Sequence, residues 1–197
     1  MAMLALPLLQ LLSLLALLSP AHSVVDKALA SSTFLKSSCA VTLYPALCIK
    51  SLSPYSATIQ HSPKLIAQAA LSVSISRAKS AKTFVTQMSK SKGMQRREYQ
   101  VVEDCVENMG DSVDRLGNSI MELGHMGHAK EQSFMWHMSN VQTWVSAALT
   151  DEDTCLDGFA EGAIDDKIKS VIRVRITHVA RLTSNALALV NRCADRH

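Results

Sequence analysis

The sequence predicts an all-α protein, in which an N-terminal α-hairpin precedes an up-down four-helix bundle. Three observations favour this fold class. Glycine and proline, which interrupt helices, are scarce at 7 and 5 of 197 residues. Apolar residues recur every three or four positions over long segments, and no sustained alternation with a period of two is present. The connections between the periodic segments are short, as they are in bundles of antiparallel helices.

Residues 1–23 are predicted to be a signal peptide. They contain no charged side chain, and the leucine-rich run from Leu4 to Leu18 is shorter than the about 20 apolar residues of a membrane span. The small residues Ala21 and Ser23 stand where signal peptidase requires them. We therefore expect cleavage after Ser23 and secretion of the remainder as one domain; an uncleaved membrane anchor is the alternative.

Residues 24–60 are predicted to form the α-hairpin, because the segment SSCAVTLYPALC contains two cysteines that a continuous helix would keep apart. In such a helix Cys39 and Cys48 would be about 13 Å apart, beyond the ~7 Å Cα separation that a disulfide allows. The step Tyr44-Pro45 disfavours helix before the proline and permits a new helix to start there. A turn at this step brings the two cysteines within bonding distance.

Residues 61–197 are predicted to form the four-helix bundle. Ser62 and Pro63 supply an N-cap and a first-turn proline for the first long helix, and Gly124 is expected to end the second. The four helices are expected at about 62–91, 97–123, 130–150 and 165–192. The clearest apolar seam lies on the second helix, where steps of four and three residues alternate, and it comprises Val102, Val106, Met109, Val113, Leu116, Ile120 and Leu123.

The chain has five cysteines, so four can pair and one is left over. Cys105 lies on the second bundle helix, and Cys155 is expected just beyond the end of the third. A bridge between them would close a loop of about 50 residues and contribute about 4 kcal/mol in the chain-entropy model. This pairing is favoured because it leaves a local Cys39–Cys48 bridge intact. Spacing alone does not fix the connectivity, and Cys193 is a competing partner.

Several motifs occur together in a distinctive order. The predicted signal peptide is followed by C-x8-C, EDCVENMGDSVDRL, VQTWVSAALTDEDTCLDGF and LTSNALALVN. This set resembles the plant invertase and pectin methylesterase inhibitor family, and the resemblance covers the chain after residue 23. It implies the hairpin and bundle described above and the disulfides Cys39–Cys48 and Cys105–Cys155. Cys193 is then expected to be a free thiol near the C-terminus, and a disulfide-linked dimer is the alternative.

The resemblance also implies a function. The expected protein is secreted to the apoplast and cell wall, has no enzyme activity and no cofactor, and inhibits a carbohydrate-processing enzyme by binding it. Because the chain stops at His197 with no esterase domain, a stand-alone inhibitor is expected.

Pectin methylesterase, in a 1:1 complex, is the favoured target. Invertase inhibitors of this family typically carry a Pro-Lys-Phe step on the third bundle helix, whereas the comparable stretch here is HAKEQSF. Inhibition of cell-wall or vacuolar acid invertase is the alternative.

An acidic row on the second bundle helix is the candidate partner-binding site. Glu107, Asp111 and Asp114 are spaced by four and three residues and should form one exposed stripe. Like charges at this spacing repel, so helix stability alone does not favour them. An ordinary solvated face is the bland alternative. The resemblance implies that these residues, with Thr154 and Asp157, contact the esterase and that the second and third helices cover its substrate groove.

Other side-chain groupings are weaker candidates. The histidines His125, His128 and His137 match no common zinc spacing, so no metal site is expected. Cys193 and His178 would lie about 22 Å apart along one helix, which argues against a thiol nucleophile with its base. An unrecognised secreted hydrolase is the remaining alternative, although no G-x-S-x-G or H-E-x-x-H motif supports it. We also expect Trp136 and Trp144 to pack on the third helix.

Basic residues are distributed over the first and fourth bundle helices and the loop after the first, and the formal net charge is +3. Ordinary solvated helix faces are the favoured interpretation, and weak retention by acidic pectin is the alternative. Nucleic acid is not an expected partner of a secreted chain. The residues concerned are Lys79, Lys82, Lys90, Lys92, Arg96, Arg97, Lys167, Lys169, Arg173, Arg175 and Arg181.

Overall fold

The structure is a computed structural model that describes residues 29–91, 93–126, 131–160 and 165–195. Within these ranges every regular element is a helix. The predicted signal peptide, residues 1–23, lies outside the described residues. No helix in the described part of the chain has the length and apolar character needed to cross a membrane.

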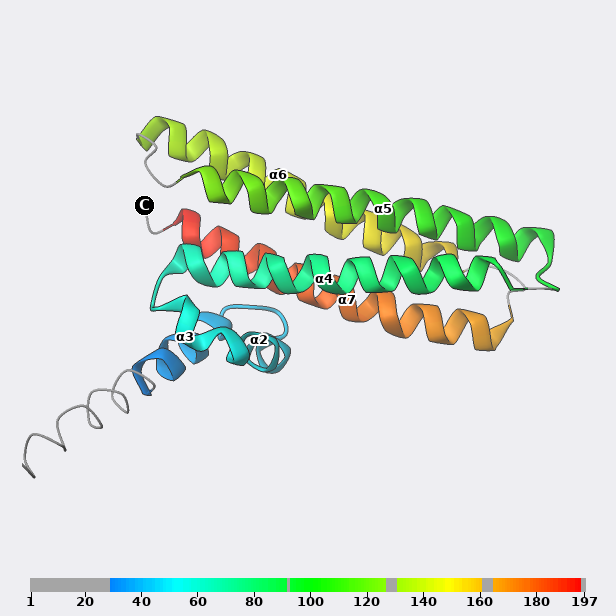
Figure 1. Ribbon diagram of the computed structural model, residues 1–197, viewed down its shortest axis with the longest axis horizontal. Coiled ribbons are helices and arrows are strands. Elements are labelled where there is room, and N and C mark those ends of the chain that lie inside the picture. The colour runs from blue at the N-terminus through cyan, green and yellow to red at the C-terminus, as the bar shows by residue number, and fades with distance from the viewer. Residues whose placement is uncertain (1–28, 92, 127–130, 161–164, 196–197) are drawn as a thin grey trace, which may run out of the picture.

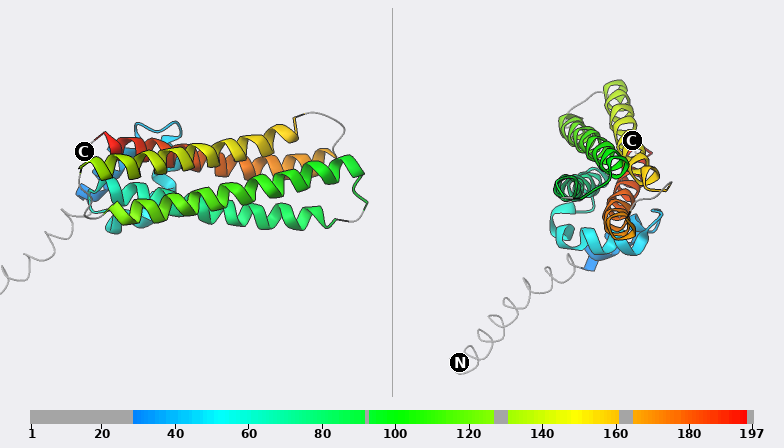
Figure 2. Two further views of the ribbon diagram at one scale, coloured as in Figure 1. Left: turned by 90° about the horizontal axis from the view of Figure 1, so that it is seen from above. Right: turned by 90° about the vertical axis from the view of Figure 1, so that its right-hand side faces the viewer.

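Four long helices form the body of the molecule, as the sequence predicts. Each long helix packs side by side with two others, so that the order around the bundle is α4, α5, α6, α7. Figure 1 shows them as a stack of antiparallel rods, and the end-on view in Figure 2 shows α5 and α6 on one side with α4 and α7 on the other. The helices are α4 Pro63–Ser89, α5 Arg96–His125, α6 Glu131–Gly158 and α7 Asp166–Ala194.

Polar side chains start two of these helices at the expected places. The Ser62 hydroxyl accepts a hydrogen bond from the Leu65 amide at 3.3 Å, and Pro63 follows in the first turn of α4. The Asp165 carboxylate accepts from the Lys167 amide at 2.8 Å at the start of α7. These caps satisfy amides that have no partner within their own helix.

A buried glutamate joins the starts of α5 and α7. Glu98 lies on the first turn of α5 and is 7% exposed. Its two carboxylate oxygens accept from the Gln95 amide and from the Asp165 amide, each at 2.8 Å. One side chain therefore caps its own helix and fixes the beginning of another.

The core follows the apolar seam of α5. Val102, Met109, Leu116 and Leu123 are each 0% exposed, whereas the alternate seam residues are half-buried at the edge of the core. Burial of such aliphatic side chains contributes about 1.5–3 kcal/mol each. The facing helices supply fully buried residues of the same kind, which include Leu71, Val85, Val145, Ile172 and Ile176.

The hairpin packs on the α4–α7 side of the bundle (Figures 1 and 2). Helix 29–39 and α2 Pro45–Leu52 flank the turn that contains Tyr44, and the Cys39–Cys48 disulfide joins them with a Cα–Cα distance of 5.6 Å. Two short helices, η1 Ser53–Tyr55 and α3 Ser56–Ile59, lead on to α4.

Asn185 of α7 fixes the hairpin turn to the bundle. Its side-chain oxygen accepts from the Tyr44 amide and its side-chain nitrogen donates to the Tyr44 carbonyl, each at 3.0 Å. Asn185 is 3% exposed, and both bonds are at least partly buried. This pairing gives the LTSNALALVN motif a structural role.

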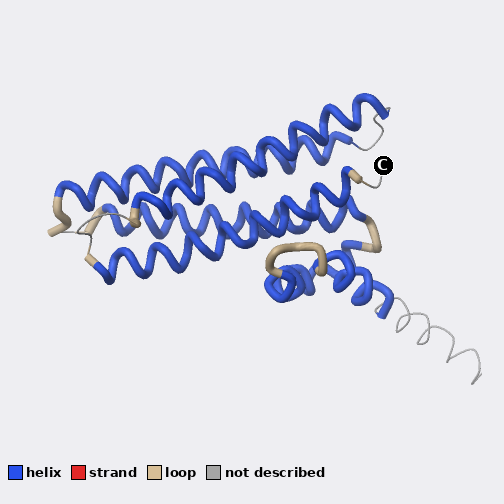
Figure 3. The backbone as a smooth tube through the Cα atoms, turned by 180° about the vertical axis from the view of Figure 1, so that it is seen from behind, coloured by secondary structure: helices blue, strands red, loops and turns tan. Residues whose placement is uncertain are grey.

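The structure corrects two expectations about the third bundle helix. The helix does not end near Thr150, because α6 continues to Gly158 and contains Cys155 within it. The polar run DEDTCLDG has the composition of a loop, but contacts with α5 hold it in helical form. Trp136 does not pack into the protein either, since it is 62% exposed. The backbone trace in Figure 3 shows that α6 continues unbroken as one long helix.

Candidate functional site

Acidic side chains are concentrated on α5 and α6. From Glu98 to Ala160 the sequence contains only two residues with a fixed positive charge, Arg115 and Lys130, and Lys130 lies outside the described residues. We call the exposed acidic side chains of these two helices, together with Thr154, the acidic face. It comprises Asp104, Glu107, Asp111, Asp114, Asp153, Thr154 and Asp157, all of them exposed.

The α5 part of the acidic face is a single row. Glu107, Asp111 and Asp114 are exposed, as the sequence predicts, and Asp104 extends the row by one turn. The intervening residues Met109 and Ser112 are fully buried. The row is therefore carried on the outer side of a helix whose inner side is fixed in the core.

A disulfide brings the α6 part against α5. Cys105 and Cys155 are bonded, with their Cα atoms 4.4 Å apart, and both are buried. Asp104 and Thr154 are the residues immediately before these cysteines, and Asp157 is two residues after the second. The bond thus places both parts of the acidic face in the same region of the bundle.

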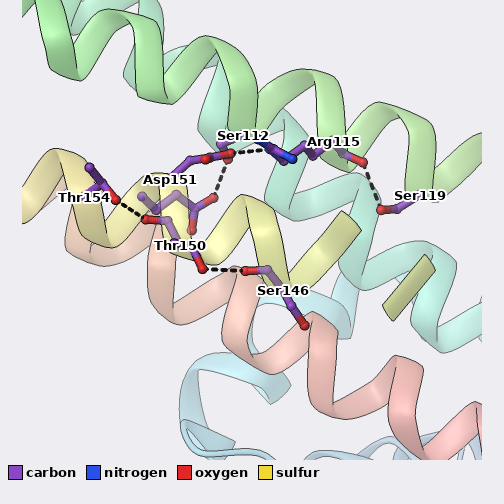
Figure 4. A network of polar contacts seen from close by, with 8 residues as sticks. Ser112, Arg115, Ser119, Ser146, Thr150, Asp151 and Thr154 are labelled. Carbon is purple, nitrogen blue, oxygen red and sulfur yellow. Dashed lines mark hydrogen bonds and ion pairs between the residues drawn. The ribbon is translucent and has the colours of Figure 1, made fainter. Parts of the chain in front are cut away.

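An ion pair adds a second link between the two helices. The Arg115 Nε donates to the Asp151 carboxylate at 2.7 Å, and Figure 4 shows Asp151 of α6 reaching Arg115 of α5. Burial raises the pKa of Asp151, Arg115 acts to lower it, and the charge of Asp111 raises it further. Asp111 and Asp151 therefore act on each other across the α5–α6 contact.

Hydroxyl groups form a ladder along the outer side of α6. Thr154 Oγ1 donates to the Thr150 carbonyl at 2.8 Å, and Thr150 Oγ1 donates to the Ser146 carbonyl at 3.1 Å (Figure 4). Because the Thr154 hydroxyl already donates its hydrogen within the helix, Thr154 offers a partner its methyl group and an oxygen that accepts hydrogen bonds.

A buried carboxyl group lies beneath the acidic face. Glu152 is 0% exposed, and its Oε1 accepts from Ser112 of α5 at 2.7 Å and from Thr183 of α7 at 3.0 Å. Burial raises the pKa of Glu152 to about 8, although both hydroxyl donors act to lower it. Sequence reasoning missed this residue. The signal was its position three residues before Cys155, which places both on the inner side of one helix.

The histidine cluster gives no metal site within the described residues, where no group of three or more His, Cys, Asp or Glu side chains is placed to hold an ion. His128 lies outside the described residues. His137 Nδ1 instead lies 2.8 Å from Glu122 Oε1, which also accepts from Asn140. Hydrogen bonds from Asn140 and His137 lower the pKa of Glu122.

Cys193 forms no disulfide, but it is only 3% exposed and is therefore poorly placed for thiol chemistry. Burial raises the pKa of the Cys193 thiol, which disfavours the reactive thiolate. His178, considered as its base, is on the exposed side of α7, fifteen positions earlier.

The sequence matches the family model described as plant invertase/pectin methylesterase inhibitor over residues 33–189. Pectinesterase inhibitor 9 of Arabidopsis thaliana is 53% identical over 169 residues, which cover 84% of this chain and 83% of that protein. The 21 kDa protein of Daucus carota is 50% identical over 167 residues, covering 85% and 86%.

Solved structures agree with the fold. A mutant form of a pectin methylesterase inhibitor from Arabidopsis superposes with a TM-score of 0.61 at 21% identity, covering 78% of this chain and 92% of the other. The bundle and the N-terminal hairpin are thus accounted for together. The chain belongs to the plant invertase/pectin methylesterase inhibitor family.

Proposed function

We propose that this chain is a secreted inhibitor of pectin methylesterase. It binds the enzyme 1:1 through the acidic face, lies across the substrate groove and excludes pectin. The observation that carries the proposal is the exposed row of Glu107, Asp111 and Asp114, fixed beside Thr154 and Asp157 by the Cys105–Cys155 disulfide. The names of the relatives, among them a pectinesterase inhibitor with 53% identity, support the choice of target.

The rigidity of the acidic face favours binding. Its side chains project from two long helices that are joined by a disulfide and by the Arg115–Asp151 ion pair. Binding therefore does not have to order a loop, which lowers the entropic cost of association. Inhibition by such a surface requires no chemical step, only exclusion of the substrate.

A charge-matched comparison tests the acidic face. Asp111→Asn with Asp114→Asn should weaken inhibition at least about tenfold and slow association, because carboxylates facing an enzyme surface steer encounter and pair with its cations. The control is Asp166→Asn with Asp195→Asn, which removes the same charge from exposed positions on α7 and just after it. Equal losses in the two double variants would refute the assignment of the interface.

The target is decided by titrating the purified protein against a pectin methylesterase and an acid invertase. We expect stoichiometric inhibition of the esterase. Inhibition of the invertase alone would select the alternative target. The segment HAKEQSF, on which the sequence-based choice depends, lies partly outside the described residues. Secretion is tested separately by sequencing the N-terminus of the exported protein, which should begin at Val24.

A further inference from the structure

The side of the molecule opposite the acidic face is basic. Residues 27–97 and 167–194 contain no aspartate or glutamate, and these segments hold the hairpin, α4 and nearly all of α7. In the bundle these elements are neighbours, away from the outer sides of α5 and α6 (Figures 1 and 2). The formal net charge is only +3 because the negative charges on one side of the bundle nearly offset the positive charges on the other.

A groove runs along this side. A cleft of about 470 Å³ lies between the hairpin, α4 and α7, and Arg77 and His178 also line a second cleft of about 220 Å³ between α4 and α7. The second cleft shares Val174 and Arg175 with a third of about 430 Å³. Their walls extend along α7 from Leu182 to Ser170, a distance of about 18 Å. We call these joined clefts the basic groove.

The cations of the basic groove come from three separate elements. Lys50 of α2 and Arg77 of α4 line the groove, and Arg181 of α7 lines an adjoining cleft that shares Val174 and His178 with it. All three are exposed. Burial lowers the pKa of His178, and the charges of these same three residues lower it further. Every charged neighbour acting on His178 is therefore positive. Among the described residues, the two ion pairs given by the structure both join α5 to α6. Neither of them involves these three cations.

Aromatic rings hold two arginines of this region in place. The Arg175 guanidinium carbon lies 4.0 Å from the centre of the Phe84 ring, and that of Arg181 lies 5.3 Å from the centre of the Tyr44 ring. Val174, which lines the groove beside Arg175, is 72% exposed. The groove thus offers fixed positive charges next to exposed apolar surface.

We propose that the basic groove binds a linear polyuronate, a chain of sugars that each carry a carboxylate. The cations are spread along a groove of about 18 Å, which suits an extended anion better than a compact one such as phosphate. Sugar rings also present C–H faces that can pack on the exposed side chain of Val174. The groove lies opposite the acidic face, so a polyuronate and a protein partner can be bound at once.

The choice of uronate rests on the proposed function. A pectin methylesterase converts neutral methyl esters into carboxylates, so its product is the polyanion formed where the inhibitor acts. The acidic face would repel this polymer, and the basic groove would attract it. The inhibitor is then retained at pectin that has already been demethylated, with its acidic face directed toward free enzyme.

The test measures binding of an unesterified linear oligogalacturonide, with the fully methyl-esterified chain as the neutral control. A groove variant combines Lys50→Gln, Arg77→Gln and Arg175→Gln. The matched variant combines Lys36→Gln, Lys90→Gln and Arg97→Gln, which removes the same charge at exposed positions outside the groove. Thermal unfolding of each variant verifies that it is folded.

We expect the parent protein to bind the unesterified chain only, and more weakly as salt is added. The groove variant should lose at least about tenfold in affinity and the matched variant less than about threefold. Equal losses in the two variants, or equal binding of the esterified chain, would overturn the proposal. Esterase inhibition is measured on the same samples. An inhibitory groove variant that fails to bind uronate supports both proposals, and a parent that binds uronate without inhibiting overturns only the proposed function.

Discussion

Replacing Glu152 with glutamine should remove a large pH dependence from the folding stability. Glu152 is 0% exposed, its Oε1 is bonded to two hydroxyl groups, and its Oε2 is buried without a hydrogen-bond partner among the described residues. Glutamine keeps an oxygen for the hydroxyl groups of Ser112 and Thr183 but cannot ionise. Any cost of burying its NH2 group is independent of pH.

The magnitude follows from the raised pKa. Burial raises the pKa of Glu152 from 4.5 to about 8 in the folded protein. Between these values the folded state keeps a proton that the unfolded chain loses, so stability is greatest below pH 4.5 and falls as pH rises toward 8. At about 1.4 kcal/mol per pH unit, Glu152 should lower the free energy of unfolding by about 2–3 kcal/mol between pH 5 and pH 7.

Urea unfolding followed by circular dichroism at pH 5, 6 and 7 measures this effect. The free energy of unfolding of the parent minus that of Glu152→Gln should fall by about 2–3 kcal/mol across the series, because the other titrating groups are common to both proteins. Glu107→Gln, the same change on the exposed side of α5, controls for the chemistry of the substitution. Parallel pH profiles for the parent and Glu152→Gln would refute the argument.

Three further changes test the contacts that organise the bundle. Asn185→Ala should lower the free energy of unfolding by about 2 kcal/mol, because two backbone groups of Tyr44 lose their partners. Hydrogen exchange of the Tyr44 amide should then be faster, and an unchanged exchange rate would contradict this. Glu98→Ala should lower the free energy of unfolding, measured in urea, by about 2 kcal/mol, because two amides lose their acceptor. Glu98→Gln, which keeps one acceptor oxygen, should lower it by less. Replacing both Cys105 and Cys155 by serine should lower the free energy of unfolding by about 4 kcal/mol, since the disulfide closes a loop of 50 residues. An unchanged melting temperature would contradict this prediction.

Local signals were sufficient for most of the fold. Ser62 and Pro63 marked the start of α4, and the seam from Val102 to Leu123 marked the buried side of α5. The Tyr44-Pro45 step marked the hairpin turn. Each of these depends on backbone geometry or on helical periodicity within a few residues, which a single sequence displays directly.

The end of α6 could not be predicted in the same way. The stretch after Thr150 is polar and suggests a loop, and its helical form depends on α5, through Arg115, Ser112 and Cys105. Such support comes from residues about 40 positions away and leaves no local pattern. The exposure of the candidate row at Glu107, Asp111 and Asp114 was correctly predicted, whereas its role in binding stays a prediction.

The separation of charge between the two sides of the bundle gives the molecule a large electric dipole. In a uniform medium this dipole has no preferred direction. Near fixed negative charge it experiences a torque, which turns the α4–α7 side toward that charge and the α5–α6 side away from it. The orientation weakens as salt screens the field, within about 8 Å at physiological ionic strength. The arrangement of charge along the sequence thus determines how the whole molecule is oriented in a charged environment.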